Sequence, residues 1–174
     1  MDLERRFIIT MKSIKYFVII GIITLLIGCN FADSNNQIDF NRVIDEPKKE
    51  SLIGLWEVDS FSYNFISNHY KLDSKKVELK LVEDGTFIIK NYPDFEIGGF
   101  GKPINNELNT VSGKWNLKKI KDNWNLEMIF DKSQIYRNGI STLFELYLKS
   151  NKLIIWNSIG DPDQGNRLMF VKKE

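Results

Sequence analysis

The sequence predicts an all-β domain, an antiparallel meander of about eight strands that closes into a barrel, with an open β-sandwich as the alternative. Three observations support this fold. After Ser51, runs rich in β-branched and aromatic residues follow one another at short intervals. Turn signals separate these runs, and no stretch holds a 3.6-residue apolar period for three turns. Closing such a meander removes the unpaired strand edges.

Each expected strand shows period-2 alternation or a β-rich composition. The strands are expected at residues 54–61, 76–82, 86–92, 110–120, 124–130, 141–150, 152–160 and 166–173. Asp84-Gly85 and Ser150-Asn151 are turn signals, and the first is typical of a type I′ hairpin, in which both central residues need positive φ. The last three runs are apolar on both faces, which predicts a central position or a cover from a loop or the N-terminal segment.

Two segments of the domain lack a strand pattern. Residues 63–75 show no alternation and predict a loop or one short helix. Residues 93–108 are rich in Gly, Pro and Asn and predict a long loop, in which Gly98–Gly101 is interpreted as a lid or a plain mobile loop.

The bulk composition excludes several classes of protein. The 174 residues are 43% hydrophobic and carry a net charge of +1, typical of one globular domain. Residues 1–28 hold four basic and two acidic side chains, so the rest has a net charge of −1 and no basic face for nucleic acid. The single Cys excludes an intramolecular disulfide.

The N-terminal segment has the pattern of an export signal. Lys12 and Lys15 precede residues 16–27, twelve residues without a charge. This run is short for a membrane span, which needs about 20 apolar residues. Translation from Met1 gives a long basic region, and translation from Met11 gives a more usual one.

The apolar run ends in Leu26-Ile27-Gly28-Cys29, which resembles the lipobox of bacterial lipoproteins. The resemblance implies that residues 1–28 are a signal peptide and that the Cys29 thiol receives a diacylglyceryl group. It also implies that the new amine takes a fatty acid such as palmitate, which anchors the protein in the cell envelope, in the outer or the cytoplasmic membrane. The alternative is an uncleaved anchor with a buried, inert cysteine.

Residues 29–50 are expected to be the lipidated cysteine and a flexible tether, because polar residues dominate and the apolar ones show no period. In the alternative, Ile38, Phe40 and Val43 form a short helix or dock on the domain. Residues 51–174 are expected to be the folded domain.

That domain is similar to the lipocalin-like families found among small bacterial lipoproteins. Gly54-x-Trp56 resembles the Gly-x-Trp near the start of lipocalin barrels, and Gly113-x-Trp115-x-Leu117 recurs in mid-chain. The resemblance implies a barrel in which Arg167, from the last strand, stacks on Trp56 and closes one end.

The aromatic load of the strands has two interpretations. The first is a cavity for a small apolar ligand, lined by Trp115, Trp124, Met128, Phe130 and Phe144. The second is a filled barrel interior. The first predicts a membrane-anchored lipoprotein that binds a hydrophobic ligand, and the second an interaction module of the envelope, for assembly or immunity-type neutralisation of a toxin.

No motif after Cys29 predicts an enzyme, a cofactor or a metal. His69 lacks a partner motif for acid–base work and is expected at the surface. Asp161-x-Asp163-x-Gly165 fits a tight turn better than a calcium loop. A strip formed by Lys114, Lys118, Lys119 and Lys121 predicts a solvated face, with contact to anionic lipids as the alternative.

Overall fold

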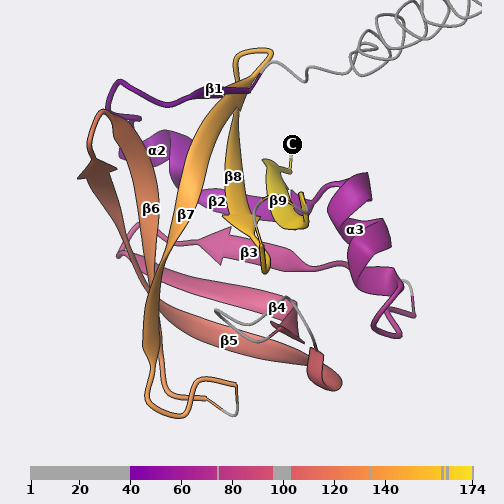
Figure 1. The fold of residues 1–174 in the computed structure, drawn as a ribbon. Coiled ribbons are helices and arrows are strands. Elements are labelled where there is room, and N and C mark those ends of the chain that lie inside the picture. Colours follow the sequence, from indigo (N-terminus) through magenta and orange to yellow (C-terminus); the bar gives the residue numbers. More distant parts are fainter. Residues whose placement is uncertain are drawn as a thin grey trace, which may run out of the picture. The chain divides into compact units, whose positions relative to one another are not determined.

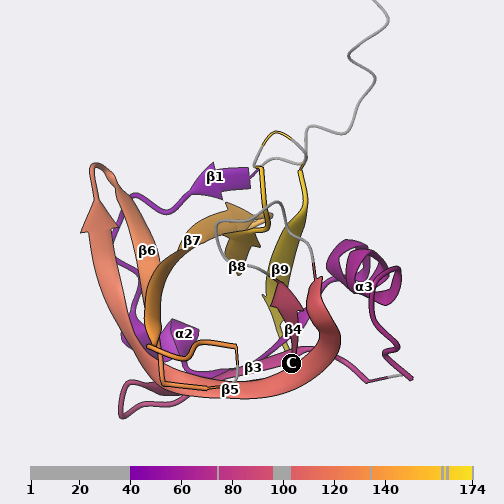
Figure 2. The same ribbon diagram turned by 60° about the horizontal axis from the view of Figure 1, so that its bottom comes forward.

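Eight strands form a closed antiparallel barrel, which confirms the lipocalin-like meander and replaces the open sandwich (Figures 1 and 2). Each strand pairs with the next along the chain, and β9 returns to pair with β2. The strands are β2 (Gly54–Val58), β3 (Glu78–Leu81), β4 (Thr86–Phe95), β5 (Pro103–Ile120), β6 (Asn123–Phe130), β7 (Ile140–Lys149), β8 (Lys152–Ser158) and β9 (Arg167–Lys172). Each of these eight strands therefore has a paired neighbour on both sides, over at least part of its length.

This computed structural model describes residues 40–73, 75–95, 103–133, 135–161, 163 and 165–173. The predicted signal peptide, Cys29, the first part of the tether and the Gly98–Gly101 stretch lie outside the described residues. The barrel belongs to a compact unit, Asp39–Glu174.

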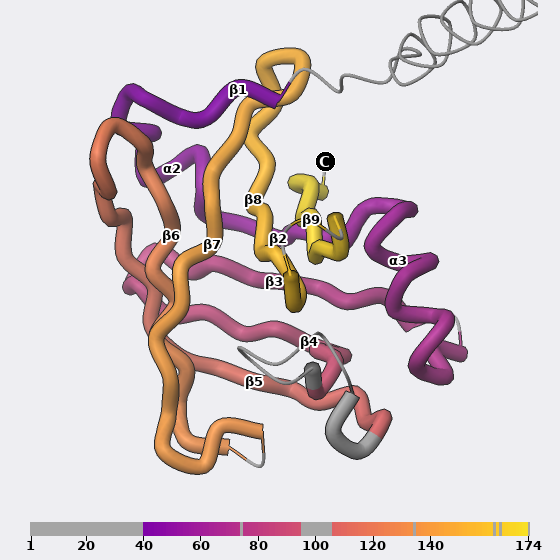
Figure 3. Tube along the Cα trace, in the orientation of Figure 1, coloured from indigo at the N-terminus to yellow at the C-terminus, as the bar shows by residue number. Residues whose placement is uncertain are grey.

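A ninth strand, β1 (Phe40–Arg42), extends the sheet beside the C-terminal half of β7 (Figure 3). The N-terminal half of β7 pairs with β6, so β1 continues the sheet where β6 leaves it. Val43 follows β1 and is buried, and its carbonyl accepts a hydrogen bond from the Trp124 N–H. Phe40 and Val43 were expected in a flexible tether. Instead they dock on the domain, which was the alternative expectation for these residues.

Two short helices flank β2. The helix α2 (Lys49–Leu52) lies within the outline of the barrel ring in Figure 2, and Leu52 is fully buried. The helix α3 (Ser60–Ser67) covers the first part of residues 63–75, expected as a loop or one short helix, and begins within the strand expected at 54–61, which ends at Val58. The Asp59 side chain caps α3 by accepting from the Ser62 N–H. The Ser62 hydroxyl in turn accepts from the Met169 N–H, which fixes α3 to β9.

The hairpin turns are formed where the sequence places them, with one difference in type. Ser150 and Asn151 both have positive φ, 49° and 62°, as a type I′ turn needs. At Asp84-Gly85 only Gly85 has positive φ, 84°, and its N–H donates to the Val82 carbonyl. The β3–β4 loop is therefore a three-residue turn closed by glycine instead of the expected type I′ turn.

The expected loop at 93–108 is wrong at both ends. β4 continues to Phe95 and β5 begins at Pro103, and β5 curves round the barrel (Figure 2). The pairing shifts register between Ile89 and Tyr92, and Asn91 has a positive φ of 55°. A second shift lies between Pro93 and Phe95, and such bulges let a strand continue through Pro and Asn residues that the composition alone assigns to a loop.

Candidate functional site

Four of the five side chains expected to line a ligand cavity meet inside the barrel. Trp115 and Met128 are opposite each other in the β5–β6 register, and the Phe130 and Phe144 rings lie 6.5 Å apart. All four are at most 3% exposed. Trp124, near the β5–β6 turn, is only half-buried and packs against the edge of the same core, with the Lys119 ammonium 5.9 Å from its ring centre.

The rings of this group pack against one another. Phe130 makes edge contacts with Phe87 at 5.0 Å and Tyr136 at 4.8 Å, and Phe144 stacks on Phe170 at 6.4 Å. A side chain that lines a water-sized cavity keeps some solvent-accessible surface. Twelve interior residues of the described strands are only 0–1% exposed to solvent. They are Trp56, Leu79, Leu81, Phe87, Ile89, Leu126, Met128, Phe144, Leu146, Ile155, Leu168 and Phe170. Among the described residues, these side chains form one packed hydrophobic core.

The expected barrel-closing pair of Trp56 and Arg167 is not formed. The β2–β9 register places Lys172 opposite Trp56, and the Lys172 ammonium lies 5.6 Å from the indole centre. Arg167 starts β9, five residues earlier, and its guanidinium lies between the rings of Phe61 and Trp156, at 4.2 and 4.4 Å. The resemblance identified the correct strand, β9. The residue of β9 that contacts Trp56 is Lys172 and not Arg167.

The two Gly-x-Trp motifs share one arrangement at this end of the barrel. The Trp56 indole N–H donates to the Leu52 carbonyl at 2.8 Å, and the Trp115 indole N–H to the Val82 carbonyl at 3.1 Å. A lysine ammonium covers each ring; that of Lys49 lies 5.4 Å from the Trp115 centre. Both Lys49 and Leu52 belong to helix α2, so α2 contacts the tryptophan of each motif.

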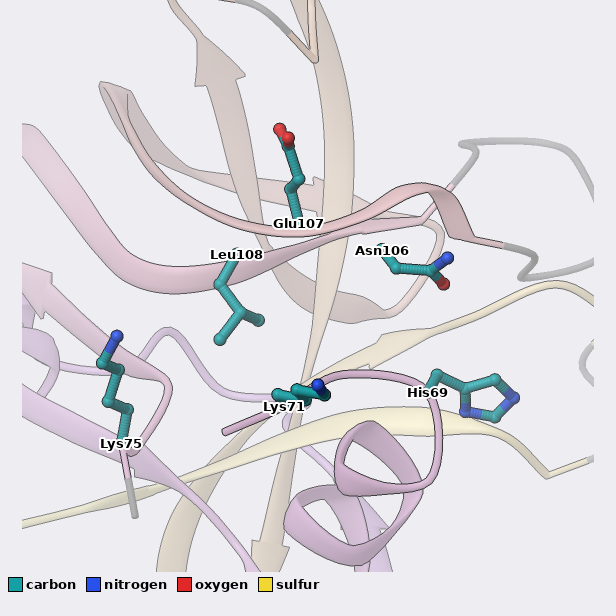
Figure 4. A pocket seen from close by; sticks show the side chains of 6 residues that line it. All are labelled: His69, Lys71, Lys75, Asn106, Glu107 and Leu108. Carbon is teal, nitrogen blue, oxygen red and sulfur yellow. The ribbon is translucent and has the colours of Figure 1, made fainter. Parts of the chain in front are cut away.

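An open groove of about 600 Å³ lies between the segment after α3 and the start of β5 (Figure 4). Its lining includes His69, Lys71 and Lys75 on one side and Leu108 on the other. Leu108 points towards the segment that carries Lys71, whereas the Glu107 carboxylate points to the other side of the strand (Figure 4). Its two lysines and histidine are exposed, as a solvated surface requires.

A buried polar pair that the sequence did not reveal lies beside this groove. The Tyr70 hydroxyl donates to the Asp94 carboxylate at 2.7 Å, and the two residues are 4% and 3% exposed. Burial, followed by the bond to Asp94, raises the pKa of Tyr70 above its ordinary value. The pair links the segment after α3 to β4.

A second aromatic group lies on the outer face of the barrel. We name Phe40, Tyr147 and Trp156 the outer ring cluster. Their ring centres are 5.3 to 6.0 Å apart, with Phe40 from β1, Tyr147 from β7 and Trp156 from β8. Ile154 and Met169 are on the same face by register and are 2% and 4% exposed, although they are not part of the interior core.

Cations cover the outer ring cluster. The Arg42 guanidinium lies 5.5 Å from the Tyr147 ring centre, and the Lys149 ammonium 5.3 Å from that of Phe40. Arg42 also pairs with Glu145 at 2.6 Å, and the Tyr147 hydroxyl donates to the same carboxylate at 3.0 Å. The cluster is therefore a surface of ring faces and positive charge, and the apolar outer positions of the last three runs were its only sequence signal.

A different part of the outer surface carries exposed aliphatic side chains. Ile88 of β4, Ile129 of β6 and Leu143 of β7 are 38–40% exposed. Ser112 is opposite Ile88 and Lys114 is opposite Ile129 in the registers of β5. We name these three aliphatic residues the aliphatic outer face.

The other expected features are placed as follows. Lys114 and Lys118 lie on the outer face of β5, and Lys118 pairs with Glu127. Lys119 lies on the opposite face, over the Trp124 ring, so the four lysines do not form one strip. The Asp161 carboxylate accepts from the Asp163 N–H, a contact typical of a turn. Among the described residues, no group of three or more His, Cys, Asp or Glu side chains is placed to hold a metal ion.

In the described ranges, no helix has the length and apolar character needed to cross a bilayer. No protein-family model, curated protein or solved structure matches this chain in the three comparisons made.

Proposed function

We propose that this protein is a lipid-anchored component of the bacterial cell envelope that acts through the outer surface of a filled lipocalin-like barrel. In this proposal it is an interaction module, for assembly or for immunity-type neutralisation, and does not carry a ligand. Cys29 supplies the anchor, because it ends an uncharged run of twelve residues and is the only cysteine in the chain.

The packing of the described interior side chains supports an interaction module over a carrier. Pockets for small molecules usually enclose about 300 Å³ or more. Met128 and Phe144 were expected to line such a pocket, and both are fully buried among other side chains. A ligand would have to displace these side chains, at a cost of several kcal/mol for each buried ring.

Closure of the barrel also limits how a protein partner can bind. Strand addition needs a free edge, and the ring of β2–β9 pairs each strand with two neighbours. Among the described strands, the three-residue β1 pairs with β7 alone and keeps an unpaired edge, but a partner of the eight ring strands must contact side chains. The aliphatic outer face offers three exposed aliphatic side chains, of which Ile129 is opposite Lys114. Interfaces of this kind bury an apolar centre within a polar rim.

The anchor is tested by Cys29→Ser. The proposal expects the variant to remain an uncleaved precursor without lipid, detected by mass and by partition into detergent. A variant that matures and partitions like the wild type would contradict the anchor.

The interaction is tested by a photo-crosslinking amino acid at Ile129, with Asp122, an exposed residue of the β5–β6 turn, as the control position. In native envelopes, position 129 should give one discrete heavier product that Ile88→Asp abolishes, and position 122 should give none. A result with no product at 129, or with a product that Ile88→Asp leaves unchanged, argues against this face.

A further inference from the structure

The outer ring cluster and its cations have the composition of a surface that rests on a bilayer. Tyr and Trp are enriched at the membrane–water interface, where an apolar ring meets polar headgroups. Arg42 and Lys149 bring positive charge to the faces of the rings of Tyr147 and Phe40. We propose that this surface docks on anionic lipid headgroups, with the rings at the interface and the cations on the phosphates.

The position of the cluster in the chain favours a membrane over another occupant. Phe40 belongs to the cluster, and only the ten residues 30–39 separate it from Cys29. A flexible coil of that length spans about 18 Å root-mean-square and at most about 38 Å when extended. With Cys29 lipidated, the surface around Phe40 is held close to the bilayer before any other part of the barrel. The inference therefore rests on the anchor in the proposed function.

Strand pairing positions the rings of this surface in the folded protein. β1 is held to β7 by three register pairs, Phe40 with Lys149 and Arg42 with Tyr147 among them. Under the rings, Ile154 is buried on the outer face. Because the side chains are already ordered, docking costs little conformational entropy.

The charge on this surface is unevenly distributed. Glu145 is neutralised by its pair with Arg42. Asp161 and Asp163 lie in the turn before Arg167, and the Asp161 carboxylate is bonded within that turn. Arg42 and Glu145 together carry no net charge, so the net positive charge comes from Lys149 at the Phe40 ring and from Arg167 at the Trp156 ring. Each basic charge near a membrane surface contributes about a fivefold gain in affinity.

The four tryptophans make the docking directly measurable. Trp156, which is half-buried, is the tryptophan of the outer ring cluster, whereas Trp56 and Trp115 are 0% and 2% exposed in the interior. Brominated lipids quench only tryptophans that reach the bilayer. Trp124, half-buried beside the β5–β6 turn, provides the matched control.

The test couples residues 29–174 through Cys29, the single thiol, to maleimide lipid in vesicles of phosphatidylcholine and phosphatidylserine. Brominated phosphatidylcholine should quench the fluorescence of the wild type and of Trp124→Phe. Trp156→Phe should lose that quenched component. Vesicles of phosphatidylcholine alone should quench less.

A second variant keeps the rings and removes charge. Arg42→Gln combined with Lys149→Gln should weaken the binding of the uncoupled chain to the anionic vesicles roughly 25-fold, two factors of about five. The inference is overturned if the wild type shows no quenching, which is the result expected if the natural occupant of this surface is a protein. It is also overturned if Trp156→Phe is quenched as strongly as the wild type. Chemical coupling replaces biological lipidation, so this outcome is independent of the Cys29→Ser test.

Discussion

Trp56 and Lys172 face each other across the β2–β9 pair that closes the barrel, with the ammonium 5.6 Å from the centre of the indole. Lys172 also donates to the Ser51 carbonyl at 2.7 Å, and the Trp56 N–H donates to the Leu52 carbonyl. One lysine of the last strand thus joins β9, the first barrel strand and α2. This relationship replaces the expected stacking of Arg167 on Trp56.

Lys172→Met keeps the apolar stem and removes the charge. We expect a loss of about 0.5–1 kcal/mol in the free energy of unfolding, since the contact is at an exposed lysine. A double-mutant cycle with Trp56→Phe should show coupling for Lys172. The same cycle with Arg167→Gln should show no coupling energy. A coupling energy between Arg167 and Trp56 would contradict the contacts described here and support the Arg167–Trp56 stacking expected from the sequence.

Gly113 is the most restrictive glycine of the motifs. A Cβ at this position would lie 2.0 Å from the Ile129 carbonyl oxygen and 2.8 Å from the Phe87 ring. Gly113→Ala should therefore destabilise the barrel by about 3 kcal/mol or more, measured by urea unfolding. Asn116→Ala, at an exposed site on the same strand, should change stability by less than about 0.5 kcal/mol. Similar stabilities for the two variants would contradict the close approach of β5 and β6.

Tyr70→Phe removes the phenol that donates to the buried Asp94 carboxylate. We expect a loss of about 1.5–3 kcal/mol, because a hydrogen bond to a charged, buried acceptor is lost. Since the pKa of Tyr70 is raised in the folded state, its phenol should ionise only as the protein unfolds in alkali. Absorbance at alkaline pH checks this: relative to the wild type, Tyr70→Phe should lose one tyrosine component at the high-pH end of the titration curve, and loss of a component near the ordinary tyrosine pKa would count against the assignment.

Glu57 on the outer face of β2 lies between two lysines. Its carboxylate is 2.5 Å from the Lys173 ammonium and 2.6 Å from that of Lys76. The close ion pair with Lys173, followed by the hydrogen bond from Lys76, lowers the pKa of Glu57 below its ordinary value. A depressed folded-state pKa means stabilisation that is present above the unfolded-state pKa of about 4.3 and is lost as the pH falls through the folded-state pKa.

Glu57→Gln should therefore lower the stability at neutral pH and flatten the acid limb of the stability curve. Urea unfolding of both proteins at neutral and acidic pH gives the comparison. The difference between them should shrink below the folded-state pKa of Glu57. A difference that stays constant with pH would show that the ion pairs do not carry it.

The period-2 pattern and the turn signals were sufficient to predict most of the barrel. Leu126, Met128 and Phe130 alternate in β6 as expected, because one face of each strand is buried. The bulged ends of β4 and β5 were missed because Gly, Pro and Asn also favour loops, and only pairing with a neighbour shows that a strand continues.

The candidate sites were harder to predict than the fold. The composition left both a filled core and a cavity open, because both need apolar side chains at the same inward positions. The outer ring cluster was missed because Phe40 is far in sequence from Tyr147 and Trp156, and only the β1–β7 pairing brings it beside them. Tyr70 and Asp94 carry no motif, and tertiary packing alone joins them.

The filled interior is the central claim, and it can be tested with an engineered cavity as the internal control. Phe144→Ala removes a fully buried ring that stacks on Phe170, at a cost of about 3–5 kcal/mol. An apolar cavity made in this way stays dry and accepts a benzene-sized molecule.

The decisive measurement is a calorimetric titration of the wild type and Phe144→Ala with benzene and with a larger apolar fluorescent probe. We expect the wild type to bind neither molecule, and Phe144→Ala to bind benzene with a rise in thermal stability. Stoichiometric uptake of the apolar probe by the wild type, with release on addition of a lipid extract, would contradict the account and restore a ligand-carrying barrel.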